Sequence, residues 1–175
     1  IVGMARTPMG GLLGELTSLS ANELGAIAVK AAMEEAGVAG EDVDQILMGN
    51  VLQAGQGQAP ARQAGIKGGL PKSVEATTLN KMCGSGMKAA MIAFDQIALG
   101  HTNVMVAGGM ERMTNAPDVL PKMRGGARLG HAQVIDHMFL DGLEDAYDKG
   151  RLMGTFAEDC AETFQFTRAI QDDYA

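Results

Sequence analysis

The first 113 residues alternate short apolar segments with segments of helical periodicity, and this alternation constrains the fold more than any other feature. Apolar runs bounded by glycine or proline predict strands over residues 1–5, 43–52, 74–79 and 104–107. Apolar residues at helical spacing predict helices over residues 20–36, 61–67 and 87–99. Strands joined in this way are typical of a sheet that helices cover on both faces. The sequence therefore predicts an α/β fold for residues 1–113.

After residue 113 the alternation stops, and we place a domain boundary there. Prolines and glycines interrupt residues 114–131, and irregular segments of this length are usually functional or interfacial. Residues 136–148 and 157–174 have helical patterns, and no strand as strong as the earlier ones follows. Residues 114–175 are expected to form part of a second, mostly helical and irregular domain.

Charge and composition argue against several classes of function. A net charge of −7 opposes binding to a phosphate backbone, and an aromatic content of 4% opposes base stacking. No run approaches the roughly 18 apolar residues that a membrane span requires. Two cysteines without zinc-type spacing predict neither a disulfide framework nor a metal site. We expect a protein of a reducing compartment, the cytoplasm, that binds neither nucleic acid nor membrane.

Cys83 is the candidate nucleophile, because it lies where the strand over residues 74–79 turns into the following helix. The free N–H groups and the positive dipole end of a helix start stabilise a thiolate and could also bind an oxyanion. Gly84 and Gly86 leave room for a thioester beside the sulfur. The alternative is a structural cysteine buried in the core.

None of the three histidines is an evident base for Cys83. His101 lies about 18 residues further on, past the end of the same helix and roughly 27 Å away. His131 and His137 fall in or near the irregular part, where surface or interface roles are expected. The catalytic set is therefore predicted to be incomplete in this chain.

Several segments, in order along the chain, resemble the thiolase family and especially its acetyl-CoA acetyltransferases. They are NKMCGSGMKA at residues 80–89, RTPMG at 6–10, GNV at 49–51, PARQ at 60–63, GGMERM at 108–113, DAY at 145–147 and LMG at 152–154. The resemblance implies a thiolase-like fold, with an N-terminal α/β/α half built on a mixed sheet. Part of an inserted loop domain would follow it.

The resemblance also implies a two-step acyl transfer in fatty acid metabolism. Cys83 would attack acetyl-CoA and become S-acylated, with its own backbone N–H as one oxyanion donor. A second acetyl-CoA would give acetoacetyl-CoA by Claisen condensation, and thiolysis is the reverse reaction. Coenzyme A thioesters are then substrates, and no tightly bound cofactor or metal is implied. Met153 matches a family methionine that lines the acyl and pantetheine pocket, and Leu152 stands where many thiolases have histidine; a core role for Met153 stays open.

No segment of the chain resembles the motifs of the family's activating histidine, its second catalytic cysteine or its oxyanion asparagine, and Cys160 is interpreted as structural. We therefore expect half of an enzyme, inactive alone, whose α/β part exposes an apolar face. The resemblance further implies a homodimer or homotetramer. Two alternatives stay open: a non-catalytic, thiolase-like module for acyl binding or assembly, and a condensing enzyme of the ketoacyl-synthase type.

Overall fold

A computed structural model describes all 175 residues, which form two compact units, Ile1–Asp118 and Val119–Ala175. The structure thus divides the chain five residues after the boundary that the sequence predicts, and each unit is described by itself below. No helix is long and apolar enough to cross a membrane.

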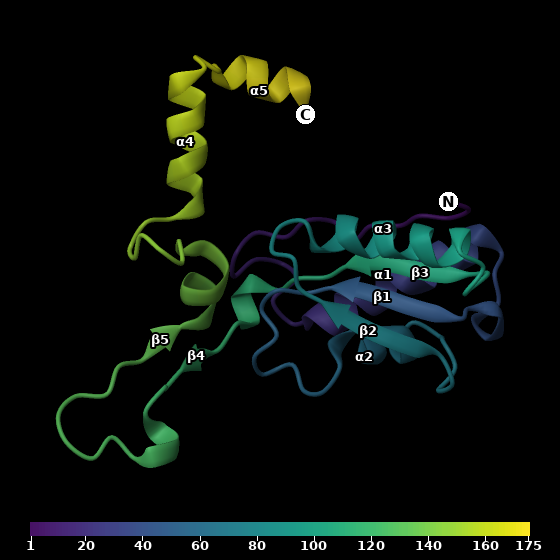
Figure 1. Cartoon of the computed structure of the whole chain (residues 1–175), viewed down its shortest axis with the longest axis horizontal. Helices are drawn as coiled ribbons and strands as arrows, with labels where there is room; N and C mark the ends of the chain where they lie inside the picture. The colour runs from purple at the N-terminus through teal and green to yellow at the C-terminus, as the bar shows by residue number, and fades with distance from the viewer. The chain divides into compact units, whose positions relative to one another are not determined.

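The first unit is built on a three-stranded sheet in the order β2-β1-β3, with both pairs parallel. Its main elements are α1 (Ala21–Ala36), β1 (Gln45–Gly49), α2 (Pro60–Lys67), β2 (Glu75–Leu79), α3 (Ser85–Ala98) and β3 (Met105–Gly109) (Figure 1). A capping box of Ser20 and Glu23 begins α1, and Gly37, in the left-handed region, ends it. The central strand is β1, so the segment that follows it lies between the segments that follow the other two strands.

Alternate side chains of β1 pack on opposite faces of the sheet. Ile46 and Met48 belong to a core that they share with residues of α1 and α2, whereas Leu47 packs with Ala89 and Ala93 of α3. The sheet is therefore covered on both faces, as the sequence predicts, and the α/β class is confirmed.

Two details of the predicted sheet are wrong. Residues 1–5 form no strand, because the N–H of Met4 donates to the carboxylate of Glu35 at the end of α1 (2.9 Å) instead of joining a ladder. The sheet is also wholly parallel rather than mixed, since one helical crossover leads from β1 to β2 and a second leads from β2 to β3.

Asp44, just before β1, ties the start of this strand to the residues before β3. Its carboxylate accepts the N–H groups of Asn103 (2.7 Å) and Val104 (3.1 Å). These bonds, that of Asn103 first, lower the pKa of Asp44, because they favour the charged form.

The folded-state pKa of Asp44 lies below its unfolded value, so its contribution to stability is complete above the unfolded value. We expect this contribution to be lost as the pH falls below about 4 and through the folded pKa. Denaturant unfolding at a series of pH values should show a shallower acid dependence in Asp44→Asn than in the wild type. The same change at Asp95, whose side chain forms no hydrogen bond, is the control. Equal acid dependence in wild type and Asp44→Asn would contradict the assignment.

The second unit has short elements only. They are a 3-10 turn (Met123–Gly125), β5 (Ile135–Asp136), which pairs with β4 (Asp118–Val119), a π-helical turn (Phe139–Leu143), α4 (Met153–Thr163) and α5 (Arg168–Tyr174). The predicted helix over residues 136–148 is thus reduced to one turn, because the Asp145 carboxylate accepts the N–H groups of Tyr147 and Asp148 and builds a turn instead. The predicted helix over residues 157–174 is broken in two at Gln165, which has a φ of 57°.

Candidate active site

Cys83 lies between the end of β2 at Leu79 and the start of α3 at Ser85, and it is exposed. The chain reverses sharply there, with Met82 in the left-handed region at a φ of 47°. A non-glycine residue in this region is uncommon and is held only where the surroundings fix it. The position agrees with the sequence prediction, and the alternative of a buried structural cysteine is wrong.

Ser85, which is only 6% exposed, fixes this turn. Its hydroxyl accepts the N–H of Lys81 (2.9 Å) and donates to the carbonyl of Met82 (2.6 Å). The Asn80 side-chain oxygen accepts the N–H of Met82 (2.9 Å). These bonds enclose Cys83 on both sides in the sequence, so the sulfur is carried on a short, cross-linked turn.

The first turn of α3 keeps free donors beside Cys83. The first hydrogen bond at the start of the helix runs from the N–H of Lys88 to the carbonyl of Gly84 (2.9 Å), and the N–H groups of Gly86 and Met87 donate to no group. Unpaired N–H groups at a helix start favour negative charge. The turn can therefore bind a developing oxyanion.

The histidines supply no base near this turn within the first unit. His101 follows α3 at the end opposite Cys83, where its Nδ1 lies 3.1 Å from the Gln96 side-chain oxygen. His131 is exposed in the second unit, as expected. His137 differs from expectation, because it is 7% exposed and its Nδ1 lies 2.6 Å from a carboxylate oxygen of Asp141, one helical turn away.

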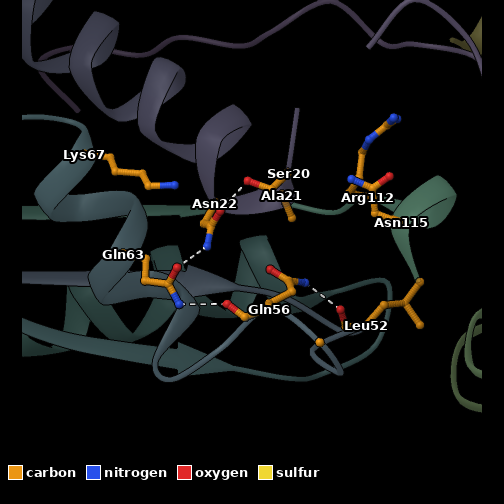
Figure 2. Close-up of a pocket in the computed structure, with 10 residues that line it drawn as sticks. Ser20, Ala21, Asn22, Leu52, Gln56, Gln63, Lys67, Arg112 and Asn115 are labelled. Atoms are coloured by element: carbon orange, nitrogen blue, oxygen red, sulfur yellow. Dashed lines mark hydrogen bonds between the residues drawn. The ribbon is translucent and has the colours of Figure 1, made fainter. Parts of the chain in front are cut away.

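A polar cavity of about 320 Å³ lies in the first unit, beside the N-terminus of α1 and against Leu52, Gly55 and Gln56. Asn22 donates to the Gln63 side-chain oxygen (2.5 Å), and Gln63 donates to the backbone carbonyl of Gln56 (2.8 Å) (Figure 2). No cysteine or histidine lines it. The cavity therefore offers no nucleophile, and the only reactive group that the structure presents at a strand-to-helix turn is Cys83. No group of three or more metal-ligating side chains is found in the structure.

Comparison with known proteins decides the family. Residues 1–175 match the family described as the thiolase N-terminal domain. The chain belongs to the thiolase family. It is similar over its whole length to acetyl-CoA acetyltransferase 2 of Arabidopsis thaliana (56% identity), to the cytosolic acetyl-CoA acetyltransferase of Gibberella zeae (47%) and to the mitochondrial acetyl-CoA acetyltransferase of Bos taurus (50%). It covers 43%, 44% and 41% of these three relatives, so it spans less than half of their length.

The other residues that the thiolase resemblance singles out lie in the second unit. Leu152 is the residue before α4 and Met153 is its first residue, and both are partly exposed. Their place beside a bound acyl group stays a prediction. Cys160, which is interpreted as structural from the sequence, is exposed on α4.

Asn50 and Glu111 of this thiolase chain were not singled out as site residues, although their contacts join two of the segments that follow the sheet. Each is an ordinary polar residue after a strand, and 60 residues separate them along the chain. Both residues follow strands that are parallel neighbours in the sheet, and the carboxyl ends of such strands lie close together. This common position is the sequence feature from which they could have been identified.

We expect Cys83 to react with iodoacetamide at pH 7 roughly three- to tenfold faster than Cys160, because the two lie at opposite ends of helix dipoles. Both thiols are exposed, so access alone does not separate them. Cys83 precedes the first turn of α3, whereas Cys160 lies near the C-terminal end of α4. Peptide mapping of the alkylated protein measures both rates in one sample, and equal rates would contradict the role of the helix start.

Proposed function

We propose that Cys83 is the nucleophile of a thiolase-type acyl transfer between coenzyme A thioesters. The observation that carries the proposal is the exposed Cys83 on a cross-linked turn beside unpaired N–H groups, in a chain of the thiolase family. The relatives' names give acetyl-CoA as the substrate to test first. The proposal needs no metal and no tightly bound cofactor.

In the first step the Cys83 thiolate attacks the thioester carbonyl of acetyl-CoA. A bond forms between the sulfur and the carbonyl carbon, the bond to coenzyme A breaks, and coenzyme A leaves with the proton that the thiol gave up. The backbone N–H of Cys83 is proposed as one donor to the oxyanion. In the second step another acetyl-CoA loses an α-proton, and its carbanion attacks the acyl-cysteine to give acetoacetyl-CoA and the free thiol. Thiolysis is the same sequence in reverse.

We further propose that this chain provides the nucleophile half of the enzyme, and that other residues supply the proton transfers. The exposed face of α3 supports this. Met87, Met91 and Phe94 lie on it, and Phe94 is 72% exposed, whereas the small Ala89 and Ala93 face the sheet. A contiguous apolar face of this kind marks an interaction surface. We propose an assembly into a homodimer or homotetramer, a cytoplasmic location, and an acyl pocket that includes Leu152 and Met153.

The 175-residue chain by itself is expected to show no thiolase turnover. The only histidine of its first unit lies beyond the opposite end of α3, so no base there reaches the sulfur. Acetoacetyl-CoA formation measured with the purified chain and with a protein of the relatives' full length checks this. Equal specific activity of the two would contradict the half-enzyme proposal.

The acyl-enzyme itself is tested by intact-mass spectrometry of the full-length protein after incubation with acetyl-CoA. One acetyl group is expected, and peptide mapping should place it on Cys83. Acetylation at another residue, or none, would overturn the proposed function.

A further inference from the structure

Asn50, the residue after β1, is 1% exposed, and both its amide nitrogen and its amide oxygen form hydrogen bonds. The amide nitrogen donates to the carbonyl of Met110 (3.2 Å) and to a carboxylate oxygen of Glu111 (2.8 Å). The amide oxygen accepts the side-chain N–H of Gln56 (3.1 Å), which also donates to the carbonyl of Leu52 (2.6 Å; Figure 2). The orientation of the Asn50 amide is therefore fixed from both ends.

Glu111, after β3, holds the segment that follows β1. One carboxylate oxygen accepts the N–H of Val51 (2.8 Å), and the other accepts the N–H of Leu52 (3.2 Å) as well as the Asn50 amide. Backbone N–H groups that bond to a carboxylate fix a segment more firmly than neutral bonds do. Asn50 and Glu111 thus act together on residues 51–56.

Asn50 and Glu111 lie at the carboxyl ends of the parallel strands, where Cys83 also lies. Gly49, the last residue of β1, is in register with Leu79 at the end of β2 and with Gly109 at the end of β3. The backbone N–H of Asn50 donates to the carbonyl of Leu79 (3.0 Å), four residues before Cys83. The turn of Cys83 is closed by Ser85 and Asn80, and neither of them forms a hydrogen bond with the Asn50 side chain.

We propose that Asn50 and Glu111 are positioning residues, which hold residues 51–56 as one wall of the site where the acyl thioester meets Cys83. The inference rests on the proposed function. Asn50 and Glu111 order residues 51–56 and not the turn that carries Cys83. Their loss should therefore affect acyl transfer and the alkylation of Cys83 differently. Loss of the pair should slow transfer from acetyl-CoA and leave the reaction of Cys83 with a small alkylating agent nearly unchanged.

An exchange of amide and carboxylate tests the pair in the full-length protein. Asn50→Asp keeps the side-chain shape but faces the Glu111 carboxylate and the Met110 carbonyl with an oxygen. Glu111→Gln removes the charge that holds Val51 and Leu52. The double variant N50D/E111Q restores one donor and one acceptor between the two side chains. The matched control is Gln45→Glu, because Gln45 lies at the opposite end of β1 and donates to Glu75 of β2 (2.7 Å).

Three measurements are made on each variant: single-turnover acetylation of Cys83, its alkylation rate by iodoacetamide, and hydrogen exchange of the backbone amides at residues 51 and 52. In Asn50→Asp we expect acetylation at least about tenfold slower, alkylation within about twofold of wild type, and faster exchange at both amides. The double variant should recover part of the acetylation rate and protection that Asn50→Asp loses, because a donor again faces an acceptor between the two side chains, and Gln45→Glu should change none of the three.

Unchanged acetylation and exchange in Asn50→Asp would overturn the inference, as would an equal loss of acetylation and alkylation, or a double variant no better than Asn50→Asp. If the wild-type protein takes no acetyl group at Cys83, the proposed function is wrong and the role in acyl transfer falls with it. The exchange measurement then still decides whether Asn50 and Glu111 order residues 51–56.

Discussion

Gly49→Ala is expected to destabilise the protein by about 3 kcal/mol or more. A Cβ at this position would lie 2.5 Å from the Ser85 Cβ, 2.7 Å from its carbonyl carbon and 2.9 Å from the Gly86 nitrogen. Two of these are backbone atoms at the start of α3, so relief requires the helix start to leave the sheet. Ser85 also closes the turn of Cys83, and Cys83 should lose its reactivity advantage over Cys160. Denaturant unfolding and alkylation mapping measure the two effects.

Gly108→Ala is the matched control, because Gly108 also lies in the sheet, opposite Met48. Its added Cβ would meet only the Met48 sulfur and terminal methyl, at 3.3 and 3.7 Å, and this flexible end can move aside. A small loss of stability, below about 1 kcal/mol, is expected. Similar losses for the two alanines would show that α3 is not seated as closely on β1 as the structure has it.

The turn around Cys83 could be predicted because its determinants are local. A β-branched strand, a short polar turn, two glycines and a long helical pattern follow one another within residues 74–99. The helix start and the place of Cys83 directly before it follow from that order.

What the sequence could not predict depends on distant groups. The strand expected over residues 1–5 fails because Glu35 takes the N–H of Met4. The contact between Asn50 and Glu111 joins residues 61 positions apart and has no local signal. His137 is buried, and its ring lies within hydrogen-bond distance of Asp141, one turn away. Most of the helix that the sequence predicts for this segment does not form.

The apolar face of α3 shows a different limit. Periodicity predicts that one wide face is apolar, and it does not say what that face contacts. In the structure Ala89 and Ala93 pack on the sheet, while Met87, Met91 and Phe94 are exposed. Only small residues fit between α3 and the sheet because the helix lies close to it. The short distances from a Cβ at Gly49 to Ser85 show this close approach. The larger apolar side chains are therefore available for another surface.

Cys83→Ala is expected to reduce the exchange of label between acetyl-CoA and coenzyme A by roughly three orders of magnitude or more in the full-length protein. This exchange reports the first half-reaction alone, since it needs only formation and reversal of the acyl-enzyme. Alanine removes the sulfur that forms the bond and leaves the turn intact, because Ser85, Asn80 and the free N–H groups of α3 are unchanged. Any activity that survives must then come from binding and polarisation of the thioester, not from a covalent intermediate.

Cys160→Ala separates this loss from a general effect of removing a thiol. Cys160 is exposed on α4, and its replacement should leave the exchange rate within about twofold of the wild type. Unfolding curves of both variants should match the wild type, because neither side chain is part of the core. Exchange at the wild-type rate in Cys83→Ala would remove the nucleophile from the mechanism, and loss of exchange in Cys160→Ala would place a second essential thiol in the second unit.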